Sequence, residues 1–154
     1  MSKLEVNILR LENQTIYGVW KNSNDKTVSE DIKSLSEKYN SIISSSEESP
    51  LPFYVLSRNY NQETKDFEIF VGSTTQRDNL ESLMLPAGEY ASITIKPKFG
   101  FLWGTSIGEA KRYFYTKWLP ETPYNSKNIE YEYHTEKSKG KHPAVDIIFA
   151  IGRR

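Results

Sequence analysis

Hydrophobic and polar residues alternate along several short segments of the chain, and in two longer segments they recur at helical spacing. The alternation predicts strands at 4–11, 15–20, 52–60 and 66–72 in the first half, and at 88–96, 129–136 and 144–152 in the second. Turn-prone polar stretches such as 21–26 and 61–65 separate these segments. The predicted strands are short and follow one another closely, which is typical of antiparallel hairpins.

Each half also contains one predicted amphipathic helix. The first follows Thr27, which with Glu30 has the pattern of a capping box, and continues to about residue 44. The second runs from about 106 to 118, with Ser106 and Glu109 as its capping pair and Pro120 as its end. Its apolar stripe consists of Ile107, Ala110, Phe114 and Trp118.

Both halves therefore read strand, helix, strand, strand, which predicts an internal repeat covering about 1–75 and 82–154. The closing segments 66–72 and 145–152 are alike in outline, and they end in Gly72 and Gly152. We expect a single α+β domain over residues 1–154 with pseudo-twofold symmetry. Its antiparallel sheet would carry both helices on one face and a central ligand groove on the other.

The strand at 129–136 has an unusual composition. Glu130 and Glu132 alternate with Ile129, Tyr131 and Tyr133, so carboxylates and aromatic rings lie on opposite faces. We expect the apolar face to pack against the helices, which leaves Glu130, Glu132 and His134 on the open face. Two interpretations remain for the glutamates. They belong either to a solvated strand face or to the floor of an aromatic cleft, where a carboxylate would favour an organic cation.

Composition excludes several classes of protein. Twenty basic residues balance twenty acidic ones in 154 residues, so no net charge attracts nucleic acid. The chain has no cysteine, no apolar run near the roughly 20 residues that cross a bilayer, and no signal peptide. We therefore expect a cytoplasmic protein without a membrane or nucleic-acid partner. Aromatic residues make up 13% of the chain, so much of its packing surface is aromatic.

Three other chemistries find little support in the sequence. Residues 104–108 match the G-x-S-x-G pattern of a hydrolase nucleophile, but the chain lacks the parallel-sheet pattern in which that motif works. The two histidines, His134 and His142, flank a polar turn and do not converge as metal ligands do on one helix face. No glycine-rich phosphate loop is present. We expect no metal and no cofactor.

Five segments in this order resemble the GyrI-like small-molecule-binding family, which includes the effector-binding domains of bacterial multidrug-responsive regulators. They are "TIYGVWKN", the hairpin "PFYVLSRNYNQETKDFEIFVG", "LPAGEYASITIK" with its Pro-x-Gly-x-Tyr-Ala pattern, "KWLPET" and "IEYEYHTEKS". The resemblance covers nearly the whole chain and implies two strand-helix-strand-strand units around a central groove. Within 154 residues there is no room for a helix-turn-helix, so it implies a stand-alone binder rather than a transcription factor.

The resemblance also implies a site. A groove glutamate falls on Glu130 or Glu132, and the aromatic walls on Tyr54, Tyr90 and Trp103, with Trp20 next. The function it implies is the binding of lipophilic, often cationic aromatic molecules. An alternative is a hydrolase of cyclopropane-bearing alkylating compounds, in which a groove glutamate activates water and a groove tyrosine donates a proton. The sequence does not identify the natural ligand, the catalytic residue or the oligomeric state.

Overall fold

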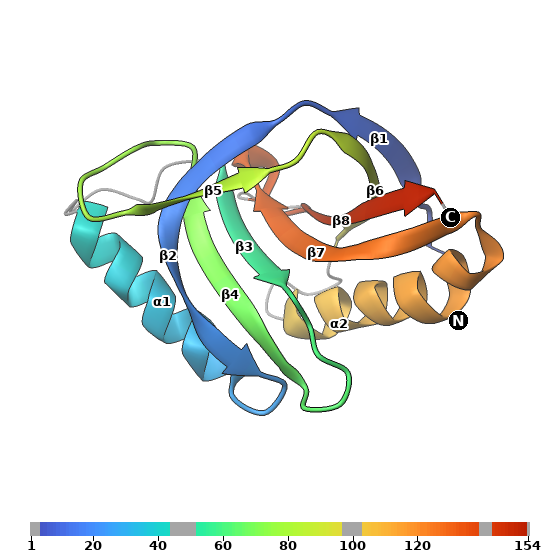
Figure 1. The fold of residues 1–154 in the computed structure, drawn as a ribbon, viewed down its shortest axis with the longest axis horizontal. Coiled ribbons are helices and arrows are strands. Elements are labelled where there is room, and N and C mark those ends of the chain that lie inside the picture. The colour runs from blue at the N-terminus through green and yellow to red at the C-terminus, as the bar shows by residue number, and fades with distance from the viewer. Residues whose placement is uncertain (1–3, 44–51, 97–102, 139–142, 154) are drawn as a thin grey trace.

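Eight strands form one antiparallel sheet, which curls into a half-barrel with two helices on its outer face (Figure 1). The computed structural model describes residues 4–43, 52–96, 103–138 and 143–153. The elements are, in chain order, β1 (Asn7–Leu11), β2 (Gln14–Asn24), α1 (Val28–Ile43), β3 (Phe53–Arg58), β4 (Asp66–Ser73), β5 (Glu81–Leu85), β6 (Gly88–Ile95), α2 (Trp103–Tyr113), η1 (Phe114–Trp118), η2 (Leu119–Glu121), β7 (Tyr124–His134), η3 (Glu136–Ser138) and β8 (Val145–Arg153).

The strand order across the sheet is β1, β6, β8, β7, β3, β4, β2, β5, and it is symmetric about the junction of β7 and β3. The unit β2–α1–β3–β4 occupies one side of this junction, and β6–α2–β7–β8 occupies the other. The α+β class with paired strand-helix-strand-strand units is therefore confirmed. Strand β5 was not predicted, because its five residues form a short edge strand without a clear alternation.

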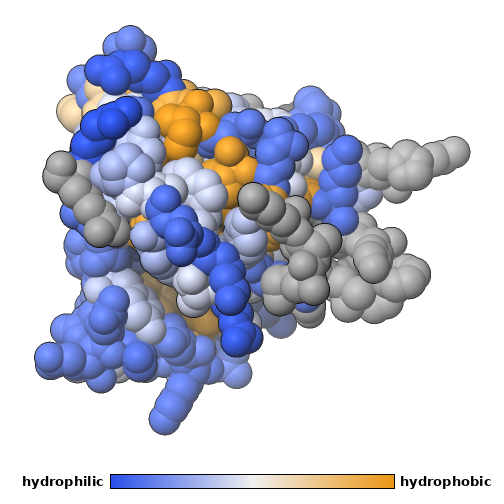
Figure 2. Space-filling model, turned by 90° about the vertical axis from the view of Figure 1, so that its right-hand side faces the viewer, coloured by the Kyte–Doolittle hydropathy of each residue, from blue (hydrophilic) through white to orange (hydrophobic). Residues whose placement is uncertain are grey.

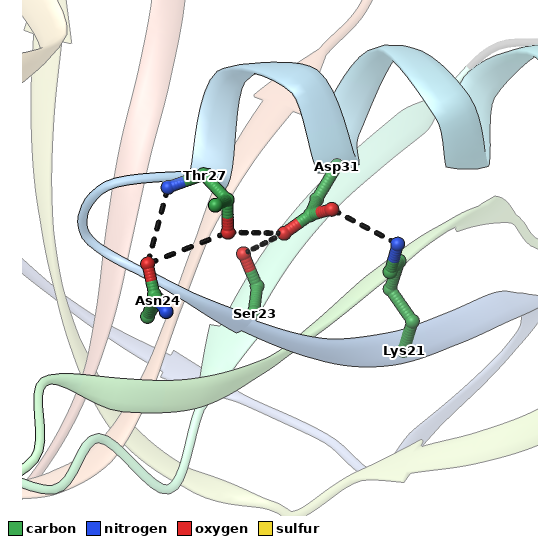
Figure 3. A network of polar contacts seen from close by, with 5 residues as sticks. All are labelled: Lys21, Ser23, Asn24, Thr27 and Asp31. Carbon is green, nitrogen blue, oxygen red and sulfur yellow. Dashed lines mark hydrogen bonds and ion pairs between the residues drawn. The ribbon is translucent and has the colours of Figure 1, made fainter.

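Helix α1 begins where the sequence predicts, but the acidic side chain that bonds to Thr27 in its first turn is not the predicted Glu30. Asn24 Oδ1 accepts hydrogen bonds from the backbone N–H groups of Lys26 and Thr27. Figure 3 shows the Thr27 bond and the hydrogen bond of 2.8 Å that the Thr27 hydroxyl donates to Asp31. Asp31 also accepts a hydrogen bond from the hydroxyl of Ser23 and lies 2.9 Å from the ammonium group of Lys21. The acid that Thr27 contacts is thus Asp31, one residue beyond the predicted Glu30.

Helix α2 begins at Trp103, three residues before the predicted start, so Ser106 lies inside the helix and is not its cap. After Tyr113 the helix widens into the π-helical turn η1 and then tightens into the 3₁₀ turn η2, which contains Pro120. The predicted apolar stripe is confirmed, since Ala110 and Phe114 are buried and Trp118 stacks on Phe114 with ring centroids 5.4 Å apart. None of the helices in the described ranges is both long and apolar enough to cross a membrane.

The core has three parts. Two lie between the sheet and the helices: one packs α1 against β2 and β4, and the other packs α2 and η1 against β6 and β8. The third fills the inside of the curl and is built from strand residues, among them Tyr131, with Ile129 and Tyr133 packed at its margin. Figure 2 looks onto the side where both chain ends lie and shows apolar patches bordered by polar residues.

The position of Tyr131 corrects one prediction. Ile129, Tyr131 and Tyr133 do not face the helices but the concave interior of the sheet. The physical reason is the curl: a strongly curved sheet packs its own side chains against one another on the inner face, so that face needs no helix to cover it.

Candidate functional site

Glu130 and Glu132 lie on the helix-bearing face of the two central strands. On β7 they are opposite Phe149 and Ile147 of β8, residues that pack with α2. On the other side Glu132 is opposite Val55 of β3, which packs with the core under α1. Cross-strand partners point to the same face. The two carboxylates therefore occupy the strip of sheet between the helices, at the pseudo-twofold junction.

Glu130 is held by the helix that flanks it. Its Oε1 accepts a hydrogen bond of 2.7 Å from the Tyr115 hydroxyl, and its Oε2 lies 2.7 Å from Nζ of Lys111. Lys111 belongs to α2 and Tyr115 to η1, so the π-helical turn is what carries the phenol to the carboxylate. Such turns are rare in proteins, and those that occur are often found at functional sites. The Glu130 side chain is 15% exposed.

These contacts change the acidity of both partners of Glu130. Burial raises the pKa of the Tyr115 hydroxyl, and the neighbouring Glu130 carboxylate raises it further. For Lys111, burial by itself lowers the pKa, but Glu130 and Glu132 outweigh it, so the pKa of the ammonium group is raised overall. At neutral pH Tyr115 therefore keeps its proton and Lys111 keeps its charge.

Glu132 has a weaker set of partners. Its Oε1 lies 3.0 Å from Nε2 of His134, and its side chain is 15% exposed. The ring of His134 is in turn close to Phe53, with centroids 6.3 Å apart. Lys111 is already in direct contact with Glu130 and interacts with Glu132 only through longer-range attraction. With a neutral imidazole, the group formed by Glu130, Glu132 and Lys111 carries a net charge of −1.

A small cavity of about 150 Å³ opens at the Glu130 end of this strip. Its wall is fixed by Asn128, which has a left-handed backbone (φ 61°) where the pairing of β7 with β8 is irregular. Asn128 Oδ1 accepts the N–H of Tyr60, and its Nδ2 donates to the carbonyl of Tyr60. The lining residues are Asp25, Ser57, Arg58, Tyr60, Phe67, Lys111, Asn128 and Glu130.

The structure separates the predicted aromatic residues from the glutamates. Tyr54 and Tyr90 are buried inside the curl, on the other face of the sheet, beside Tyr131. Trp20 is opposite Phe70, a residue of the same inner core, and is 39% exposed. Trp103 is the first residue of α2, and its side chain lies outside the described part of the structure. Neither Tyr54, Tyr90 nor Trp20 shares a face with Glu130 or Glu132.

Sequence reasoning missed Lys111 and Tyr115. They are four residues apart on the second predicted helix, beside the apolar stripe, a spacing that places both on one side of a helix. This spacing could be read from the sequence, but it points to a site only when Glu130 and Glu132 are known to lie under that helix. In the described ranges, no group of three or more histidine or acidic side chains is arranged to hold a metal ion. His142 lies outside those ranges.

Residues 8–151 match a family model described as integron-associated effector binding protein. No curated protein matches the chain in sequence. Among solved structures, an integron cassette protein from Vibrio cholerae is 16% identical, covers 96% of this chain and 95% of its own, and superposes with a TM-score of 0.70. SAV2435 bound to tetraphenylphosphonium is 10% identical over 97% of this chain and 94% of its own, with a TM-score of 0.71. The C-terminal domain of EcmrR is 12% identical over 98% and 99%, with a TM-score of 0.58. At these identities the superpositions show a shared fold.

Proposed function

Because the chain belongs to the family of integron-associated effector-binding proteins, we propose that it binds lipophilic organic cations on the helix-bearing face, over Glu130 and Glu132. The family match, with the fold shared with SAV2435 and EcmrR, also confirms the predicted GyrI-like relationship. The observation that carries the proposal is the pair of largely buried carboxylates at the junction of the two units, with one ammonium group in direct contact with Glu130 alone.

The charge of this group favours a monovalent cation. Two carboxylates and Lys111 leave one negative charge uncompensated in a partly buried position, where water screens it poorly. A bound monocation would bring the site to neutrality. A dication or an anion would leave it charged, which is costly away from water.

Within the pair, we assign the ligand charge to Glu132. Glu130 already has two short contacts, one from an ammonium group and one from a hydroxyl, whereas the described contact of Glu132 is with His134. A cation approaching Glu130 would have to displace Lys111. A cation approaching Glu132 would not have to displace an ammonium group, because Lys111 is not in direct contact with that carboxylate.

Neighbouring rings supply the lipophilic part of the site. Tyr115 is partly exposed beside Glu130, and Phe53 lies near His134 at the Glu132 end. An aromatic ring attracts a cation over its face by about 0.5–2 kcal/mol. Glu130 and Glu132 are two residues apart on one strand, a spacing of about 7 Å, which is within the size of a multi-ring cation. The tetraphenylphosphonium bound to SAV2435 is a cation of this type.

Titration with tetraphenylphosphonium tests the proposal, and tetraphenylborate, nearly the same shape with the opposite charge, is the matched ligand control. We expect saturable binding of the cation and at least tenfold weaker binding of the anion. Glu132→Gln should weaken the cation about tenfold, and Glu130→Gln less than that. Glu63→Gln, a neutralisation in the exposed β3–β4 loop, should change little. Equal binding of both ions, or no effect at either glutamate, would refute the proposal.

A hydrolase is the second candidate, because Glu130 and the Tyr115 hydroxyl are in contact at 2.7 Å, the two residue types that water activation and proton donation need. The raised pKa of Tyr115 weighs against it, since a general acid works best with a pKa near the operating pH. Incubation with a cyclopropane-bearing electrophile separates the two functions. Ring-opened product beyond one equivalent of protein means turnover, whereas protection without product means sequestration.

A further inference from the structure

The concave face of the sheet contains a cavity of its own. Its volume is about 310 Å³, and it is lined by the turn between β1 and β2 together with residues of β5, β6 and β7. Ligand sites for small molecules begin at about 300 Å³. The lining residues are Leu11, Glu12, Asn13, Gln14, Leu85, Tyr90 and Tyr131. None of them belongs to the helix-bearing face described above.

Tyr90 and Tyr131 line this cavity and Tyr54 packs beside Tyr131; the hydroxyls of Tyr54 and Tyr90 already have hydrogen-bond partners. Tyr54 donates to Oε1 of Gln14 at 3.2 Å, and Tyr90 donates to the carbonyl of Pro86 at 2.5 Å. Tyr131 is packed between them, with ring centroids 5.4 Å from Tyr54 and 6.4 Å from Tyr90. Its side chain is 4% exposed and lines the cavity, yet its hydroxyl has no hydrogen bond among the described residues.

Among the described residues, the buried side-chain oxygen without a hydrogen bond is that of Tyr39, so the Tyr131 hydroxyl is not sealed from solvent. It is a free hydrogen-bond donor at the wall of this cavity. Burial, with the nearby hydroxyls of Tyr54, Tyr90 and Tyr133, raises the pKa of Tyr131, so the group remains a protonated donor. Two polar lining residues are already hydrogen bonded: Asn13 Oδ1 accepts the N–H of Ala87 at 2.7 Å, and Gln14 Oε1 accepts the hydroxyl of Tyr54. Glu12 is exposed, so its charge lies at the solvent end of the cavity.

We propose that this cavity is a second ligand site, which takes a small, neutral, mostly apolar molecule whose carbonyl or ether oxygen accepts a hydrogen bond from Tyr131. Tyr131 lies between Glu130 and Glu132 on β7 and points to the opposite face. One strand therefore carries a residue of each site, and the two ligands bind at the same time. The concave site does not depend on the cation site.

Coumarin is a suitable probe, since its lactone carbonyl is an acceptor, and naphthalene is a control of similar size without one. We expect coumarin to bind wild-type protein and to shift backbone NMR signals of β1, β2 and β7. Tyr131→Phe should weaken coumarin about fivefold and leave naphthalene unchanged, which corresponds to the loss of one neutral hydrogen bond. Leu85→Trp, which fills the cavity, should abolish binding of both probes.

Competition with tetraphenylphosphonium distinguishes this site from the one on the other face. Coumarin should bind equally well in the presence of saturating cation, and Glu132→Gln should not alter its affinity. The proposal fails if coumarin does not bind, if the cation displaces it, or if Tyr131→Phe weakens coumarin and naphthalene alike. A folded Leu85→Trp variant that still binds coumarin would also overturn it.

Discussion

The Tyr115 hydroxyl donates a hydrogen bond of 2.7 Å to Oε1 of Glu130, which ties the π-helical turn after α2 to the central strand of the sheet. In the same turn Phe114 stacks on Phe149 of β8. The turn is therefore fixed by packing on one side and by a charged hydrogen bond on the other. The position of the helix over the glutamates depends on both contacts.

Replacing Tyr115 by Phe should lower stability by about 1 kcal/mol, because one hydrogen bond to a carboxylate is lost while the ring stays in place. For a chain of this length we expect a fall in melting temperature of about 2–4 °C, measured by calorimetry. Tyr60→Phe is the matched control: its hydroxyl donates to Asp25 at 2.9 Å. Asp25 is exposed whereas Glu130 is only 15% exposed, so the loss should be smaller. Equal effects would mean that the Tyr115–Glu130 contact has no special weight.

Lys111→Met should tighten the binding of tetraphenylphosphonium about three- to tenfold at low salt. The change removes a positive charge that would repel the proposed cation, and it leaves Glu130 and Glu132 without an ammonium group nearby. Stability should fall at the same time, because Glu130 loses its ionic partner. Isothermal titration at two salt concentrations measures the first effect.

The control for this prediction is Lys137→Met. Lys137 forms a comparable ion pair, 2.8 Å from Asp146, but Asp146 is opposite Tyr133 and so lies on the other face of the sheet. Cation affinity should be unchanged in this variant. If Lys111→Met weakens the cation, the charge argument for the site is wrong.

The sequence predicted the order of the helices and of every strand except β5, and it predicted which residues of β7 share a face. Both predictions follow from local rules. Alternation at 129–134 placed Glu130 and Glu132 together on one face. Which face meets the helices could not be read from the same pattern. A tyrosine such as Tyr131 can pack either under a helix or inside a curved sheet. The curl that decides between the two arises from the pairing of all eight strands.

The candidate site shows a similar limit. Glu130 and Glu132 were identified from their strand, but their partners Lys111 and Tyr115 come from another element and from an irregular turn. The widening from α-helix to π-helix begins at Phe114, whose ring packs on Phe149 of β8 in a tertiary contact. No local pattern in residues 106–118 encodes it.

Asp31 makes the stability dependent on pH in the acid range. Hydrogen bonds from Ser23, Lys21 and Thr27 lower its pKa from 3.8 to about 2 in the folded protein. Since the folded state binds the proton less tightly than the unfolded state, this stabilisation is complete above about pH 4 and is lost as the pH falls towards 2. Asp31→Asn lacks it. The difference in melting temperature between wild type and Asp31→Asn should therefore be largest near neutral pH and shrink below pH 4. Glu30→Gln, which neutralises an exposed neighbour on α1, is the control for the loss of one charge.

Gly18 and Gly72 face each other across β2 and β4, and the strands approach so closely that neither position has room for a side chain. A Cβ atom at Gly18 would lie 1.9 Å from the carbonyl oxygen of Val71, and one at Gly72 would lie 2.1 Å from that of Tyr17. Alanine at either position must push the backbones apart. We expect a loss of at least about 3 kcal/mol, measured by urea denaturation. Gly108→Ala is the control: it lies on α2 with nothing within 4 Å of the added atom, so it should raise stability by about 0.5–1 kcal/mol. A tolerated alanine at Gly18 would show that β2 and β4 are farther apart in solution.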